Sequence, residues 1–143
     1  MLNPRIDISR DLDGEPVVFA CFDLDQSEVQ ASAHAVAATM AERFRSATLS
    51  ADGVLELREL TALADELADL ASVPGIRTLV LRPARLSAYR DALARFVDSR
   101  DEAEWMRPDD REPLARVRGL LFPLEELAAQ AMHAALSPAP RVS

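Results

Sequence analysis

Leucine and alanine recur at helical spacing through most of this chain of 143 residues. An apolar side chain at every third or fourth position gives a helix one hydrophobic stripe, and such a stripe needs a partner surface to cover it. Only 5% of the residues are aromatic, so the core has to be built largely from Leu, Val and Ala, and Leu and Ala favour helices. The chain therefore predicts a bundle of amphipathic helices.

Two helical segments occupy the first half of the chain. The first spans about 25–47, where Asp25 and Glu28 form a D-x-x-E version of the capping box. The second spans about 50–72, and Pro74 with the glycine after it supplies the stop signal. Both segments carry apolar residues on one side only, which is typical of helices packed against a core.

Two more helical segments are expected in the second half. One spans about 84–103, and a polar stretch then leads to Pro113, which suits the first turn of a last helix. Pro123 falls inside that last helix. A proline in a helix interior costs about 3 kcal/mol, so we expect a kink or a break near Phe122.

The N-terminal residues have the pattern of a β-hairpin. Residues 5–10 alternate apolar and polar side chains, and residues 16–23 are rich in β-branched and aromatic ones. Asp13 and Gly14 between them are a strong turn signal. Residues 76–81 are short and β-branched, and their length leaves open whether they form a third strand or lead directly into a helix.

The predicted fold class is α+β and predominantly helical, a bundle of four to five helices with a small N-terminal β-hairpin and room for a third short strand. An all-α fold is the alternative, and it requires the segment VVFACF to be helical or irregular. We expect one globular domain over residues 1–137 and a disordered tail over 138–143.

Charge and composition limit the classes of partner that we expect this protein to bind. The net charge of −8 repels phosphate backbones and anionic lipid heads, so we expect neither nucleic acid nor a membrane as partner. Every basic side chain is Arg, which indicates a GC-rich and therefore bacterial genome. Cys21 is the only cysteine and lies in an apolar run, where a buried, unreactive thiol in a cytoplasmic protein is expected.

One stretch, SATLSADGVLELRELTAL, resembles the later part of an EF-hand calcium loop. With Gly53 at the turn position of the loop, the oxygen ligands would come from Ser50, Asp52, Glu56 and Glu59. Thr48 stands where the first carboxylate belongs. The alternative, a capped helix start, accounts for more residues of the stretch, because Ser50 is a good N-cap for the helix that follows. We therefore expect a capped helix start, no bound metal and no cofactor.

Three other groups of residues could carry function. Arg82 and Arg85 precede or begin a helix, whose N-terminus can hold an anion. Trp105 and Met106 lie in a strongly charged stretch, where they either pack back onto the chain or anchor an interface. His34 and His133 lack the neighbouring ligands that a zinc site needs, and we expect them at the surface or at the edge of the core.

No nucleophile motif, Walker loop or dinucleotide-binding fingerprint occurs in the sequence. We therefore expect a non-enzymatic cytosolic interaction protein, such as a homodimeric regulatory or accessory subunit, that binds a protein partner or itself.

Two alternatives stay open. A small-ligand or enzyme domain would be indicated by a pocket that joins Arg82, Arg85, Tyr89 and His34. An acidic inhibitor or immunity-type protein would be indicated by residues 98–104 and 109–112 gathering their acidic groups on one surface.

Overall fold

The computed structural model describes residues 1–45, 51–101 and 107–136, apart from the side chain of Asp52. In chain order the described elements are β1 (Leu2–Arg10), β2 (Pro16–Leu24), α1 (Gln26–Arg45), α2 (Ala51–Ala71), β3 (Arg77–Leu81), α3 (Pro83–Asp101) and α4 (Pro108–Leu136). The predicted α+β, predominantly helical fold is confirmed, and so is its N-terminal hairpin. The segment that the sequence left open as strand or helix approach forms a third strand. The all-α alternative is wrong.

The three strands form one antiparallel sheet in the order β1-β2-β3. Asp11 builds the hairpin turn, because its carboxylate accepts hydrogen bonds from the backbone N–H groups of Asp13 and Glu15, both at 2.9 Å. Gly14 has a φ of 80°, a conformation that residues with a Cβ rarely adopt. The central strand is therefore β2. It pairs on one side with β1, its neighbour in the sequence, and on the other side with β3, which follows α1 and α2 in the chain.

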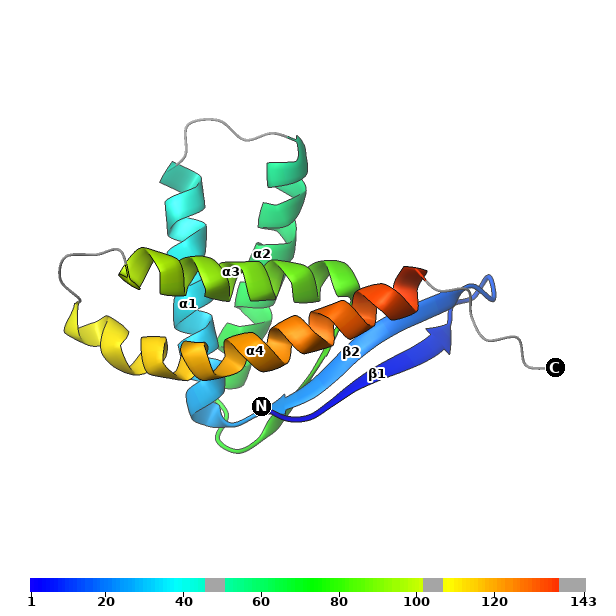
Figure 1. Cartoon of the computed structure of the whole chain (residues 1–143), viewed down its shortest axis with the longest axis horizontal. Helices are drawn as coiled ribbons and strands as arrows, with labels where there is room; N and C mark the ends of the chain where they lie inside the picture. Colours follow the sequence, from blue (N-terminus) through cyan, green and yellow to red (C-terminus); the bar gives the residue numbers. More distant parts are fainter. Residues whose placement is uncertain (46–50, 102–106, 137–143) are drawn as a thin grey trace.

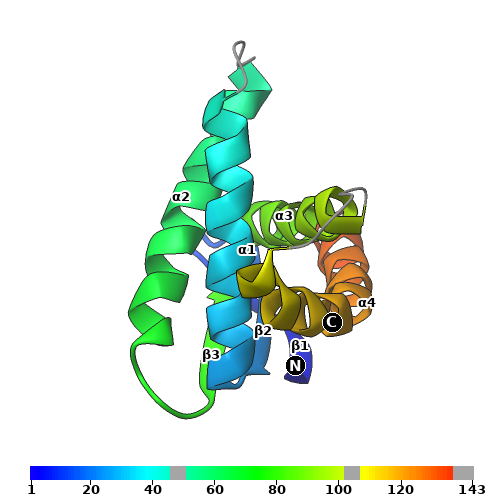
Figure 2. The same cartoon turned by 90° about the vertical axis from the view of Figure 1, so that its left-hand side faces the viewer.

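The helices lie above the sheet in Figure 1. Figures 1 and 2 show α1 and α2 as an upright pair, with α3 and α4 crossing that pair and packing on each other. The chain leaves the sheet after β2, forms α1 and α2, and returns to the edge of the sheet as β3. This arrangement leaves the strands along the lower side of the molecule.

The core fills the space between the helices and one face of the sheet. Alternate residues of β2 point into it, and Ala20, Phe22 and Leu24 are fully buried. The helices contribute the leucine and valine stripes expected from the sequence, among them Val36, Leu60, Leu63, Leu67, Leu86, Leu93, Val117, Leu120 and Leu124. Each such side chain contributes about 1.5–3 kcal/mol when fully buried, so the inter-helix stripes supply most of the packing energy.

The predicted capping box at the start of α1 is confirmed. The Asp25 carboxylate accepts a hydrogen bond from the Glu28 N–H at 2.8 Å, and the Glu28 carboxylate accepts one from the Asp25 N–H at 3.0 Å. The hydrogen bonds from the Ser27 hydroxyl and from the Glu28 N–H hold the pKa of the Asp25 carboxyl below its usual range. The N-terminal amine of Met1 lies 2.5 Å from the second oxygen of Glu28.

The start of α4 differs from the prediction. The helix begins at Pro108 rather than Pro113, because Pro108 has the same advantage in a first turn and is followed by Asp109 and Asp110, whose charges suit the helix dipole. The helix also continues through Pro123 without a break, as one bowed helix in Figure 1. Buried leucines on both sides of that proline hold the two halves against the same core.

We expect Glu28→Gln to lower the free energy of unfolding by about 1–2 kcal/mol, because Gln can still cap the helix but leaves the buried Met1 amine without a counter-charge. Urea unfolding of the two proteins measures this difference. Glu125→Gln, at an exposed position of α4, is the matched control and should change little. Equal effects of the two substitutions would contradict a stabilising role for the amine–carboxylate pair.

Candidate functional site

The stretch that resembles a calcium loop begins a helix in the structure. Gly53 and all later residues of the stretch lie within α2, while Ser50 falls outside the described residues. Glu56 contacts Arg43, and Glu59 accepts a hydrogen bond from Arg85 at 2.9 Å. Among the described residues no group of three or more His, Cys, Asp or Glu side chains could hold a metal ion.

Trp105 and Met106 lie in the segment 102–106, outside the described residues, so the structure leaves their suggested interface role as a prediction. The same holds for part of the acidic cluster around them. Of its described members, Asp101 is paired with Arg118, and Asp110 is buried against a cation. These two carboxylates are therefore engaged within the chain.

Arg82 and Arg85 line a hollow of about 620 Å³ at the edge of the sheet, where α3 begins. Phe19 and Val80 form its apolar wall. The Arg85 guanidinium is neutralised by Glu59 from α2. Arg82 is exposed and has no side-chain partner among the residues that the structure describes.

Tyr89 and His34 do not join this hollow. Tyr89 is fully buried in the core, where its hydroxyl lies 2.5 Å from the Ser32 hydroxyl, and burial raises the pKa of Tyr89 well above its usual value. His34 lies on α1 and faces α3 and α4 instead. The structure therefore does not bring Tyr89 and His34 into the hollow that Arg82 and Arg85 line.

A polar cluster that the sequence did not reveal joins three helices around Asp110. The His34 Nε2 atom lies 2.7 Å from one oxygen of Asp110, and the Arg100 Nε–H donates to the other at 2.8 Å. Phe96 packs against both partners, edge-on to the imidazole and 4.7 Å from the guanidinium carbon. Arg100 also reaches Glu42 on α1, at 3.5 Å.

Burial would raise the pKa of the Asp110 carboxyl, but the hydrogen bond from His34 and the charge of Arg100 outweigh that effect, so the pKa lies below its usual range. An imidazole held by a carboxylate can serve as a general base when a nucleophile or substrate lies beside it. Among the described residues, no serine, threonine or cysteine side chain forms a hydrogen bond with His34. The cluster ties the first turn of α4 to α1 and α3, and its main effect is to fix how these helices meet.

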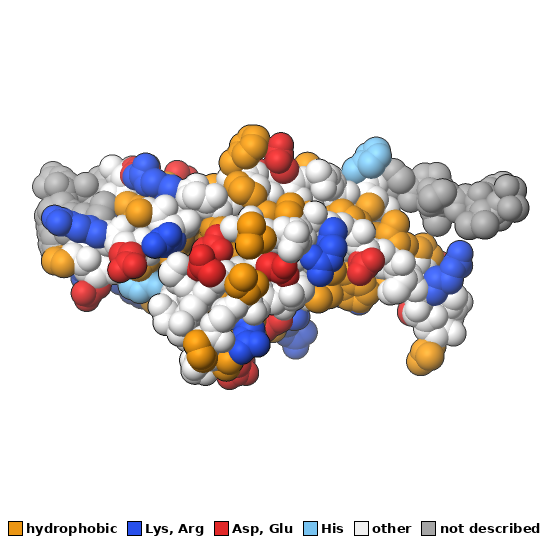
Figure 3. Space-filling model, turned by 90° about the horizontal axis from the view of Figure 1, so that it is seen from below, with side chains coloured by type: hydrophobic (Ala, Val, Ile, Leu, Met, Phe, Trp, Pro, Cys, Tyr) orange, Lys and Arg blue, Asp and Glu red, His pale blue; other side chains and the backbone are white. Residues whose placement is uncertain are grey.

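The lower face of the sheet carries a second set of apolar side chains. In β2 the residues that alternate with the core positions are Val17, Phe19 and Cys21, and in β3 their neighbour is Val80, which is 51% exposed. Figure 3 looks onto this side and shows hydrophobic atoms gathered among charged groups of both signs. We call this surface the open face.

The partners across the strands define the rest of the open face. On β1, Arg5 stands opposite Cys21 and Asp7 opposite Phe19. Cys21 is buried, as expected from the sequence, and burial raises the pKa of its thiol. The Asp7 charge raises this pKa further and the Arg5 charge lowers it. Both residues lie on the same face of the sheet as the thiol, because residues paired directly across two strands point to the same face.

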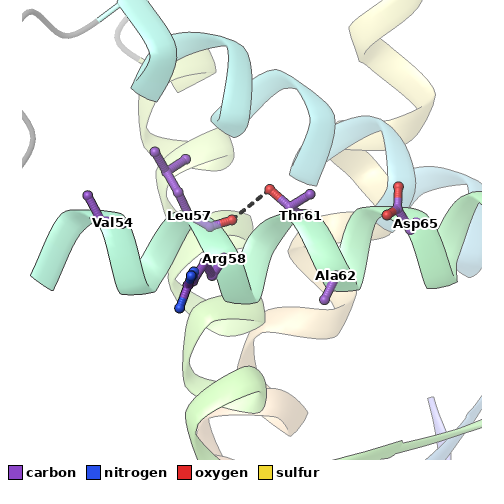
Figure 4. A pocket seen from close by; sticks show the side chains of 6 residues that line it. All are labelled: Val54, Leu57, Arg58, Thr61, Ala62 and Asp65. Carbon is purple, nitrogen blue, oxygen red and sulfur yellow. Dashed lines mark hydrogen bonds between the residues drawn. The ribbon is translucent and has the colours of Figure 1, made fainter.

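A second hollow, of about 450 Å³, lies along α2. Figure 4 shows that all of its lining side chains come from this one helix, and the Thr61 hydroxyl donates to the Leu57 carbonyl at 2.7 Å. The only charges are on Arg58 and Asp65. Side chains of a single helix cannot enclose a small ligand, so this hollow is a groove on the surface rather than a binding pocket.

The open face can be recognised from the pattern of residues in the sequence, whereas the cluster around Asp110 cannot. The segment PVVFACFDL is apolar at consecutive positions, and a strand that is apolar on both faces is normally covered on both. This pattern distinguishes β2 from β1, in which apolar and polar side chains alternate along the strand. By contrast, His34, Arg100 and Asp110 are too far apart in the sequence for any spacing rule to bring them together.

We expect Asp110→Asn to lower the free energy of unfolding at neutral pH by about 1–3 kcal/mol, because Arg100 loses a buried counter-charge. A carboxyl whose pKa is lowered in the folded state stabilises the fold above the pKa of the unfolded state, and this contribution is lost as the pH falls through the folded-state pKa. The stability of Asp110→Asn should therefore fall less steeply in acid than that of the wild type.

Urea unfolding between neutral pH and about pH 3 measures both effects. Asp109→Asn is the control, since Asp109 is the exposed neighbour in the same helical turn. Parallel stability–pH curves for Asp110→Asn and the wild type would show that the carboxylate contributes nothing in its ionised form.

Comparison of the chain with protein-family models, with curated proteins and with solved structures finds no match. Among the described residues, no helix is both long and apolar enough to cross a lipid bilayer. A function for this protein has to be argued from its own surfaces, and of these the open face of the sheet is the most distinctive.

Proposed function

We propose that the protein is a non-enzymatic interaction protein that associates with a second copy of itself through the open face of the sheet. The observation that carries the proposal is the apolar centre of that face. Phe19, on the central strand, is half-buried, and Val80, on the neighbouring strand β3, is 51% exposed, although the helices pack against the other face of the sheet. Exposed apolar patches with a polar border are typical of protein–protein contacts.

The border of the open face favours a second copy over a strongly basic partner. Arg5 and Asp7 lie on β1, and Arg82 follows β3, so both signs of charge are present around one apolar centre. A surface that carries both signs can be complementary to itself when two copies meet about a two-fold axis. The acidic net charge of the chain does not dominate this face.

The size of the face sets the strength of the association. Nine residues of β2 at about 3.4 Å each and strands about 4.8 Å apart give a flat area of roughly 400 Å² per copy. Stable complexes bury about 800 Å² per partner. We therefore expect a reversible dimer with a Kd in the micromolar range rather than an obligate one.

Sedimentation velocity over a range of protein concentrations tests the proposal. We expect the wild-type protein to pass from monomer to dimer as its concentration rises, and Phe19→Asp to remain monomeric. A carboxylate at the centre of a face-to-face contact would be desolvated without a partner, which costs several kcal/mol. Circular dichroism of the variant checks that it is folded.

Phe122→Asp is the matched control, because Phe122 is a phenylalanine on α4 that is 68% exposed and lies outside the open face. This variant should associate like the wild type. A wild-type protein that stays monomeric at several hundred micromolar, or a Phe19→Asp variant that associates normally, would contradict the proposal.

A further inference from the structure

We infer that Asp7 and Arg82 determine the pairing of the two copies: Asp7 of each copy faces Arg82 of the other across the open face. This inference rests on the proposed function, since it specifies the partner and the arrangement of the same contact.

Most charges around the open face are satisfied within the chain. The Arg5 guanidinium donates to the Asn3 carbonyl at 2.8 Å, and Asp23 accepts hydrogen bonds from Thr78 and Asn3. At the edge, Arg85 pairs with Glu59. Among the residues that the structure describes, Asp7 and Arg82 are the two charged side chains of this face that form neither a hydrogen bond nor an ion pair within the chain, and their signs are opposite.

The register places these two charges on opposite sides of Phe19. Asp7 pairs with Phe19 on β1. On the other side Ala20 pairs with Leu81, so the next step of the antiparallel register brings Arg82 beside Phe19, and Arg82 and Phe19 line the same hollow. One row across the sheet thus carries a carboxylate, an aromatic ring and a guanidinium. The two charges stand about 10 Å apart, two strand spacings.

A two-fold axis parallel to β2 and passing above Phe19 exchanges the two ends of this row. The phenylalanines of the two copies then meet at the centre. Each Asp7 lies over the Arg82 of the other copy, and two ion pairs form at once. Packed sheets lie about 10 Å apart, a distance that an arginine and an aspartate side chain can bridge together.

A two-fold axis perpendicular to the strands is the competing arrangement. If it passes above the row of Ile6 and Ala20, it places Asp7 over Arg5 of the other copy and leaves both Arg82 side chains without a counter-charge. The axis along β2 is favoured because Arg5 already donates to the backbone of its own chain, whereas Arg82 does not. The two arrangements predict different pairs of complementary variants.

We expect charge reversal at these positions to leave the fold intact. Arg82 occupies the N-cap of α3, since its carbonyl accepts the first helical hydrogen bond from the Leu86 N–H at 2.9 Å. Aspartate is a better N-cap residue than arginine, so Arg82→Asp should stabilise the helix. Asp7 is exposed on an edge strand, where arginine is tolerated. A loss of association cannot then be attributed to unfolding.

Sedimentation equilibrium of the full chain tests the inference with two variants, Asp7→Arg and Arg82→Asp. Each reversal turns two attractive contacts of the dimer into repulsive ones, and we expect each variant alone to dimerise about 10- to 100-fold more weakly than the wild type. An equimolar mixture of the two should form a heterodimer with a Kd within about threefold of the wild-type value, because both contacts again join opposite charges, one as the native pair and one with the signs exchanged.

The outcomes separate this inference from the proposed function. If Phe19→Asp abolishes association but the mixture does not recover it, the open face is the interface and the pairing of Asp7 with Arg82 is wrong. If association recovers instead in a mixture of Asp7→Arg with Arg5→Asp, the two-fold axis of the dimer is the one perpendicular to the strands. If Phe19→Asp has no effect, the proposed function fails, and the pairing fails with it.

Discussion

The structure depends on a central strand that is apolar on both of its faces. The upper face of β2 carries the fully buried Ala20, Phe22 and Leu24, onto which the helices pack. The lower face carries Val17, Phe19 and Cys21, and the four helices all lie on the upper side. Because the chain places its helices on one side only, the upper apolar face of this strand is covered, whereas Val17 and Phe19 on the lower face stay partly exposed and available for another molecule.

The helices are held in place by two kinds of contact. Leucine stripes provide most of the burial, and they carry no information about which helix meets which. The polar contacts supply that information: the Asp110 carboxylate meets His34 and Arg100, and the Tyr89 hydroxyl meets Ser32 within the core. A polar group buried without its partner is costly, so such contacts favour one arrangement of a bundle over others.

Local signals in the sequence were sufficient to predict most of the helices and the hairpin. The capping box at Asp25 and the Asp13–Gly14 turn are where the spacing placed them, because these features depend only on neighbouring residues. The start of α4 was misplaced because two prolines of the same stretch, Pro108 and Pro113, both suit a first turn. The candidate sites were harder to predict. The Asp110 cluster and the Asp7–Phe19–Arg82 row each join distant parts of the chain, and only the folded register brings those parts together.

The most direct test of the open face as an interface is a dilution series followed by two-dimensional ¹H–¹⁵N NMR of the wild-type protein. The account predicts concentration-dependent shifts of the amide signals of β1, β2 and β3, greatest around Phe19, with the outward-facing residues of α2 unchanged. Shifts confined to α2 or to the exposed side of α4, or none up to millimolar concentration, would contradict it.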